Sequence, residues 1–294
     1  MRRLPLPLLF LVLLFTCEDP IAVDSGFTTP QLVVDAWLTN EPRPQTITLS
    51  QTQDFYDNGL PAGLDDATVV VCRTDDQRCF PFVHQDSGRY VWTPAAGEVL
   101  GEVGDEFALA IERDGERYVS LTGMGRVPPI DSISFQFEEE ALGLEEGTYA
   151  QLYARDFPGL GDTYLIRTRW NDTLNQRPQE LNLVFDATFD AGSDADGFTF
   201  IFPIRFRINR LDDDGSPVPV EIGDRVAVDL WSISRPAFAF LSIAAEQIQN
   251  GDNGLFGVPV ANSPGNIVRV DSEDRVLGIF NVAAVSSAER TRTD

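Results

Sequence analysis

The sequence contains no lysine and a single histidine, His84. Without lysine, the chain can form no Schiff base with a substrate or with pyridoxal phosphate, and it lacks the lysine of the phosphate-binding loop. A single histidine excludes a metal centre built from several imidazoles, and a serine or cysteine triad could use only His84. The nucleophile motif G-x-S-x-G is also missing. We therefore expect a protein that is not an enzyme.

Basic residues are also scarce: 22 stand against 46 acidic residues, and the formal net charge is -24. This charge repels nucleic-acid phosphates and anionic lipid, so we expect no nucleic-acid partner. A salty habitat or a GC-rich genome explains such a composition without a cationic ligand. A hydrolase that uses two carboxylates stays an alternative, because the sequence singles out no pair among so many acids. Nothing in the sequence indicates a cofactor.

Long apolar runs are absent except at the N-terminus. The run over residues 4–15 follows two arginines and is shorter than the roughly 20 residues that a membrane-spanning helix needs, which is the pattern of a secretory signal. Cys17 follows this run after Thr16, as in bacterial lipoprotein signals, where the cysteine carries the lipid. We predict a signal peptide over residues 1–16, lipidation of Cys17 and a tether over residues 17–28. An ordinary signal with an incidental cysteine is the alternative.

Two acidic residues, Glu18 and Asp19, come directly after Cys17. Acids at this place resemble the surface-export signal of Bacteroidota lipoproteins, whereas in other bacteria an acid there can retain a lipoprotein in the inner membrane. We therefore expect a lipid-anchored protein of the outer membrane that faces the cell exterior.

The sequence has three cysteines, and Cys72 and Cys79 form an even pair once Cys17 carries lipid. They flank a six-residue turn between two β-rich runs, and export places them in an oxidising compartment. We predict that they form a disulfide. Their C-x6-C spacing differs from the C-x-x-C spacing of redox and metal sites.

Short β-type runs separated by Gly, Pro, Asn and Asp fill the chain from residue 31 onward. Seven of them lie before residue 125, at the spacing of an immunoglobulin-like β-sandwich. Pro128 and Pro129 break strand pairing and indicate a boundary. The sequence therefore predicts a mostly β fold, with an immunoglobulin-like β-sandwich over residues 29–125 and a β-rich C-terminal domain over residues 126–294.

The second half contains one helical pattern and one aromatic run. Ser234 is a good N-cap, Asn250-Gly251 is a natural stop, and the apolar spacing between them predicts a packed helix over about 236–249. Four phenylalanines fall on one face of a strand by period two, and we expect that face in the core. They are Phe198, Phe200, Phe202 and Phe206.

Asp190, Asp194 and Asp196 precede Gly197 in the stretch DAGSDADG. Carboxylates in a glycine-containing loop suit calcium, which takes six to eight oxygen ligands. The stretch lacks the length and the terminal glutamate of an EF-hand loop. The three aspartates are a calcium candidate, and a solvated loop is the simpler alternative in so acidic a chain.

Several stretches together resemble a known family. They are LVVDAWLTNEPRPQTITLSQT after the Cys17 region, then ATVVV, SGRYVW, VPPIDSISF, GNIVRV and VLGIFNVAAVSS. Their order and spacing over about residues 17–287 resemble the Bacteroidota outer-membrane lipoproteins grouped as domain of unknown function 4249. The resemblance implies a two-part β-rich surface lipoprotein, commonly encoded beside a TonB-dependent transporter. The family has no established catalytic residues, so none is carried over.

The resemblance and the export signal lead to one functional hypothesis and one rival. We expect a non-enzymatic, surface-exposed lipoprotein that captures or gates a ligand as an accessory to a TonB-dependent outer-membrane transporter. The rival is a cell-surface adhesin or a structural matrix lipoprotein that works without a transporter.

Overall fold

The computed structural model describes residues 30–53, 59–186, 197–200, 202, 204–250, 263–272 and 275–294. The predicted signal peptide, Cys17 and the tether lie outside the described residues. So do the three aspartates of the calcium candidate, Asp190, Asp194 and Asp196.

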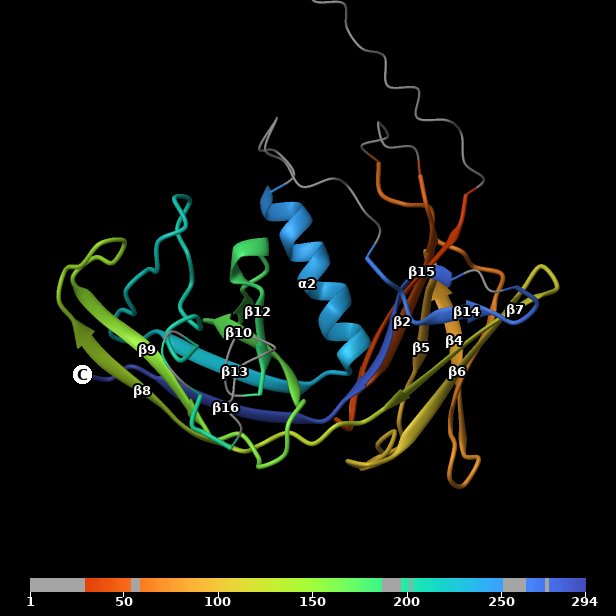
Figure 1. Cartoon of the computed structure of the whole chain (residues 1–294), viewed down its shortest axis with the longest axis horizontal. Coiled ribbons are helices and arrows are strands. Elements are labelled where there is room, and N and C mark those ends of the chain that lie inside the picture. The colour runs from red at the N-terminus through yellow and green to blue at the C-terminus, as the bar shows by residue number, and fades with distance from the viewer. Residues whose placement is uncertain are drawn as a thin grey trace, which may run out of the picture.

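Nine strands form a closed barrel in the order β1-β15-β14-β7-β6-β3-β4-β5-β2 (Figure 1). Their bounds are β1 Leu32–Thr39, β2 Gln45–Gln51, β3 Thr68–Arg73, β4 Cys79–Asp86, β5 Arg89–Trp92, β6 Glu106–Arg113, β7 Glu116–Gly123, β14 Ile267–Arg269 and β15 Arg275–Ala283. Alternate side chains point inward, as in β6, where Phe107, Leu109 and Ile111 are fully buried. The mostly β prediction is confirmed, and each of the seven runs predicted before residue 125 contains a strand.

The N-terminal segment does not complete the barrel by itself. β15 returns from the end of the chain and pairs in parallel with β1, while β14 pairs with β7. Buried Ile267, Phe280 and Val282 from these two strands join the same hydrophobic core as the N-terminal strands. The sequence interpretation had placed both strands in a separate C-terminal domain. The domain division near residue 125 stays a prediction.

The remaining strands build a second β region. A five-stranded sheet has the order β11-β10-β13-β16, with β12 also paired to β10, and β8 and β9 form a two-stranded sheet. Their bounds are β8 Ile130–Glu138, β9 Gly147–Ala154, β10 Thr163–Trp170, β11 Thr173–Leu174, β12 Asn182–Phe185, β13 Arg225–Ser232 and β16 Val285–Thr291. A second hydrophobic core, including Tyr164, Val228 and Leu230, lies here.

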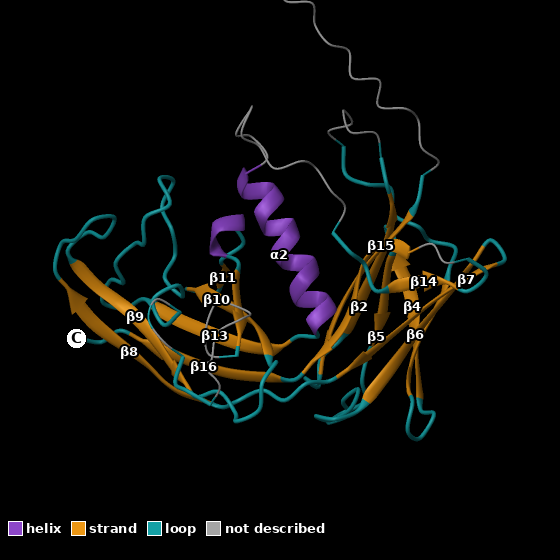
Figure 2. Ribbon diagram, in the orientation of Figure 1, coloured by secondary structure: helices purple, strands orange, loops and turns teal. Residues whose placement is uncertain are grey.

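The helix α2 spans Arg235–Asn250, which agrees with the predicted helix over about 236–249. The Ser234 hydroxyl accepts the N–H of Ala237 at 3.3 Å, so Ser234 is the N-cap as predicted. Figure 2 shows α2 between the barrel and the five-stranded sheet, and its first turns join a cluster that includes Leu165 of β10 and Ile279 of β15. The helix thus packs on both β regions.

The predicted phenylalanine strand is wrong. The described part of residues 197–208 has turns and a β-bridge in place of a continuous strand. Phe200 and Phe206 are buried, but Phe198 and Phe202 are 58% and 56% exposed. Period-two spacing places side chains on one face only when the backbone is extended, and here it turns.

None of the described helices is long and apolar enough to cross a membrane.

Candidate functional site

The disulfide between Cys72 and Cys79 is confirmed. The two residues are direct partners in the β3–β4 ladder, with their Cα atoms 4.0 Å apart. Arg73 in the same hairpin pairs with the carboxylates of Asp75 and Asp76. The bond therefore closes a tight turn of the barrel, which is a structural role.

The single histidine lies on the barrel surface. The Nε2 atom of His84 is 2.9 Å from Oδ1 of Asp65, and its ring lies 5.3 Å from the ring of Tyr90. Asp65 also accepts the N–H of Gly88 at 2.6 Å, so these contacts hold neighbouring loops together. These contacts indicate a structural role for His84.

A groove of about 600 Å³ opens on the second β region. The β8–β9 loop and the turn at residues 211–217 form two of its walls and rise on the side of the sheet that carries α2 (Figure 1). Its lining includes Leu142 and Phe202, two apolar side chains that are strongly exposed. Glu180 is the one carboxylate among its described lining residues. The groove therefore suits binding of a partly apolar ligand better than two-carboxylate hydrolysis.

A short helix, η2 (Pro178–Glu180), forms one wall of this groove. The Glu180 carboxylate accepts the N–H of Leu211 at 3.0 Å and the N–H of Arg177 at 2.9 Å, so it ties η2 to the 211–217 turn. A second cavity of about 260 Å³ lies between η2, β10 and α2 and is lined by Leu181, Leu241 and other mainly apolar residues. Glu180 lines both cavities, so they adjoin each other.

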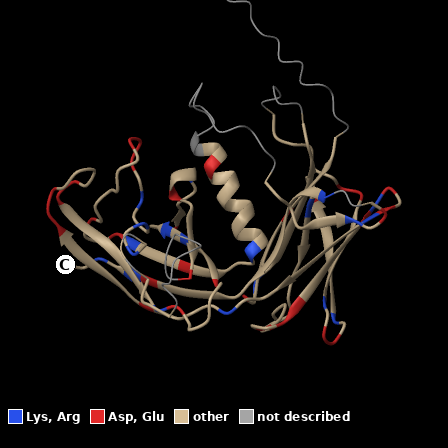
Figure 3. Cartoon of the chain, viewed as in Figure 1, with Lys and Arg blue, Asp and Glu red and all other residues tan. Residues whose placement is uncertain are grey.

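Charge around this region is concentrated in turns. Figure 3 shows acidic residues gathered in the loops of the second β region, including the turn that carries Asp212, Asp213 and Asp214. Arg177 reaches this turn and forms an ion pair with Asp213 at 2.9 Å. Exposed ion pairs of this kind contribute little stability, so the turn acts mainly as a charged rim beside the groove.

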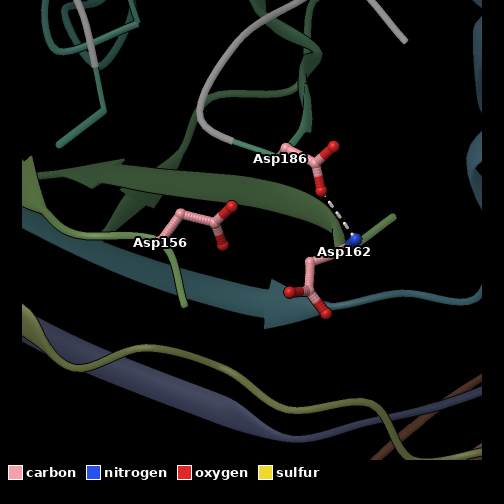
Figure 4. Close-up of side chains that lie close together, drawn as sticks. All are labelled: Asp156, Asp162 and Asp186. Carbon is pink, nitrogen blue, oxygen red and sulfur yellow. Dashed lines mark hydrogen bonds between the residues drawn. The ribbon is translucent and has the colours of Figure 1, made fainter. Parts of the chain in front are cut away.

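A second candidate site is a cluster of three aspartates away from the groove lining (Figure 4). Asp156 follows β9, Asp162 precedes β10 and Asp186 follows β12. The β10–β12 pairing places Thr163 opposite Phe185, so the adjoining Asp162 and Asp186 meet at the same end of the ladder. One oxygen from each of the three carboxylates lies within 4.8 Å of the others.

The three carboxylates have different partners. Oδ1 of Asp186 accepts the N–H groups of Gly161 and Asp162 at 2.6 and 2.9 Å. Both oxygens of Asp162 accept hydrogen bonds from the guanidinium of Arg126, the shortest at 2.6 Å. Oδ1 of Asp156 accepts the hydroxyl of Tyr164 at 2.5 Å. Thus Arg126 neutralises one of the three charges.

Two oxygens of the cluster are buried with no hydrogen-bond partner among the described residues: Oδ2 of Asp156 and Oδ2 of Asp186. Asp156 and Asp186 are only 2% and 1% exposed. Burial raises the pKa of Asp156 to about 6. The Tyr164 hydroxyl and the backbone N–H of Phe157 oppose this shift, and the charges of Asp162 and Asp186 add to it. Such a site stores unfavourable electrostatic energy until a cation or a proton enters it.

Sequence reasoning missed both the groove and this cluster. It had looked for carboxylates close together in the chain, whereas Asp156, Asp162 and Asp186 come from three separate segments. Asp156 and Asp162 lie beside β-type runs in the sequence, but Asp186 lies inside the run LNLVFDATF. Strand pairing, which brings those segments together, is not readable from local spacing.

The FN1–FN3 domains of chicken CNTN1 are 10% identical to this chain, and the match covers 69% of this chain and 60% of that one with a TM-score of 0.22. The chain therefore spans less than two thirds of that structure, and a TM-score this low does not establish a shared fold.

No curated protein matches the sequence. The family described as domain of unknown function (DUF4249) matches residues 18–289, so the chain belongs to this family.

Proposed function

We propose that this protein is a non-enzymatic lipoprotein of the outer membrane, held by a lipid on Cys17 and facing the cell exterior. It serves there as an accessory to a TonB-dependent transporter and captures a ligand or gates its passage. In this proposal the N-terminal barrel belongs with immunoglobulin-like folds, which present loops at their ends for contacts.

The groove on the second β region is the observation that carries the capture role. A concave, partly apolar surface with few polar groups is typical of ligand sites. Leu142 and Phe202 present apolar side chains there, and Glu180 and Arg207 supply charge of both signs. Because the walls are loops on a β scaffold, the ligand would rest on residues that the sheet holds in place.

The first test is co-purification of the full lipoprotein, tagged at its C-terminus, from outer membranes in mild detergent. Mass spectrometry should then identify a TonB-dependent transporter at stoichiometric amounts. Recovery of the lipoprotein alone, together with binding to a glycan array, would replace the transporter role with the adhesin alternative. A Cys17→Ser variant should lose the lipid and leave the membrane fraction.

The second test addresses the groove. A double Leu142→Glu, Phe202→Glu variant should reduce nutrient uptake by cells that keep the transporter, because two charges would then line the groove. Leu121→Glu is the matched control, since Leu121 is a 71% exposed apolar side chain on β7 of the barrel. Equal uptake by the double variant and the control, at equal surface amounts, would contradict ligand capture in the groove.

A further inference from the structure

We propose that Asp156, Asp162 and Asp186 bind a calcium ion between the ends of β9, β10 and β12. The candidate goes beyond the proposed function, because none of these residues lines the groove. It also differs from the stretch with Asp190, Asp194 and Asp196, which the sequence analysis named as a calcium candidate beside the simpler alternative of a solvated loop.

The donor set points to a hard cation. All three side chains are carboxylates, and oxygen is the ligand that calcium and magnesium prefer. Two oxygens on opposite sides of a calcium ion lie about 4.6–5.2 Å apart, whereas magnesium brings them to roughly 4.0–4.2 Å. The cluster's oxygens lie within 4.8 Å of one another, a separation that a single calcium ion can span.

The unpartnered oxygen of Asp156 is the independent observation. Its side chain is almost fully buried and points toward the other two carboxylates (Figure 4), yet Oδ2 has no hydrogen-bond partner among the described residues. Buried polar atoms nearly always have a partner, and a buried carboxylate needs one most. A bound cation supplies that partner, and it does the same for Oδ2 of Asp186 if this carboxylate turns toward it.

The local charge matches a divalent ion. Three carboxylates carry three negative charges, and the guanidinium of Arg126 offsets one of them through its ion pair with Asp162. Two negative charges remain for the cation. Asp162 is 17% exposed at its side chain, which leaves access from solvent, and its Oδ1 keeps a lone pair beyond its bond from Arg126.

A bound calcium would also fix the link between the two β regions. Arg126 lies in the segment between β7 and β8 and donates from Nη2 to the carbonyls of Pro158 and Gly159, both at 2.9 Å. The loop between β9 and β10 is thereby joined to the same linker. Cation binding should therefore stabilise this part of the molecule against local opening.

The test is a titration of the full chain in detergent with calcium chloride after removal of divalent ions by EDTA. Calorimetry should give about one ion per chain, and the unfolding temperature should rise with calcium concentration. Asp156→Asn should weaken binding by at least about tenfold. Asp214→Asn, in an exposed acidic turn, is the matched control and should bind as the wild type does.

A second measurement keeps the proposal testable if Asp156→Asn does not fold. Terbium can replace calcium, and Tyr164, bonded to Asp156, is placed to sensitise its emission. Calcium should displace the bound terbium and so reduce the terbium emission that is excited through tyrosine. The same emission should be weaker in the Tyr164→Phe variant, although that variant should still bind calcium.

Three results would overturn the site. The first is wild-type protein that gives no heat of binding and no change in unfolding temperature when calcium is added. A proton shared between the buried carboxylates would then explain the cluster. Unchanged binding by a folded Asp156→Asn would place the ion elsewhere. Loss of binding only when Asp190, Asp194 and Asp196 are replaced together would return the assignment to the stretch singled out from the sequence.

Discussion

Ser232 joins the two β regions through three hydrogen bonds. Its hydroxyl donates to the carbonyl of Gly125 at 2.8 Å and accepts the N–H of Ala284 at 3.0 Å. Its own N–H donates to the carbonyl of Ala284 at 2.9 Å. One 2% exposed side chain thus connects the end of β13, the β7–β8 linker and the residue between β15 and β16.

Replacing Ser232 by alanine leaves the Ala284 N–H and the Gly125 carbonyl without this hydroxyl. Ala284 is 1% exposed, so its N–H would be an orphaned buried donor, whereas Gly125 is exposed and its carbonyl can bond to water. One orphaned buried polar group costs about 1–3 kcal/mol, and the free energy of unfolding should fall by roughly that amount. Urea denaturation followed by fluorescence and circular dichroism measures this directly. The midpoint should fall by about 1 M, because m is typically ~1–3 kcal/mol per molar urea.

The matched control is Ser132→Ala, because Ser132 is exposed on β8. Its effect should stay within about 0.5 kcal/mol, as at most surface positions. If Ser232→Ala also changed stability by less than about 0.5 kcal/mol, the hydroxyl would not be needed at this junction. The reasoning from buried backbone groups would then be refuted for this site.

Two further predictions concern the barrel. Replacing Cys72 and Cys79 by serine opens a loop of about eight residues, which on chain entropy should cost roughly 2–3 kcal/mol of stability, measured as a lower urea midpoint. Gly278→Ala should cost at least about 3 kcal/mol, because a Cβ there would lie 1.9 Å from the Val34 carbonyl oxygen and φ is +98°. Gly97→Ala, with φ +78° but nothing within 4 Å, should cost only about 1–2 kcal/mol; equal losses in both would contradict the steric argument.

The elements that the sequence predicted well carry their signals locally. Each of the first seven strands alternates or clusters apolar residues over a few positions, with turn residues on both sides. The α2 helix has an N-cap hydroxyl, a proline in its first turn and an apolar face, all within one short stretch. The disulfide followed from two cysteines at matching positions of one hairpin.

The features that the sequence did not predict depend on contacts between distant parts of the chain. β15 is rich in apolar residues and reads as a strand from its sequence, but only pairing decides that it joins β1 in parallel and completes the barrel. Such a return of the last segment to the first is the kind of long-range topology that local pattern does not encode. For the same reason, the spacing of Phe198, Phe200 and Phe202 suggested a strand where the backbone turns.

The aspartate cluster and the calcium candidate from the sequence differ in what would make a cation necessary. The stretch with Asp190, Asp194 and Asp196 drew attention because its carboxylates are close in sequence, and calcium binding there stays a prediction. What creates a demand for a cation is burial without enough partners. Asp156 meets that condition through tertiary structure, at the end of a strand whose neighbours come from elsewhere. In such proteins, a buried carboxylate without enough hydrogen-bond partners is therefore a stronger indication of a cation site than several carboxylates that are close in sequence.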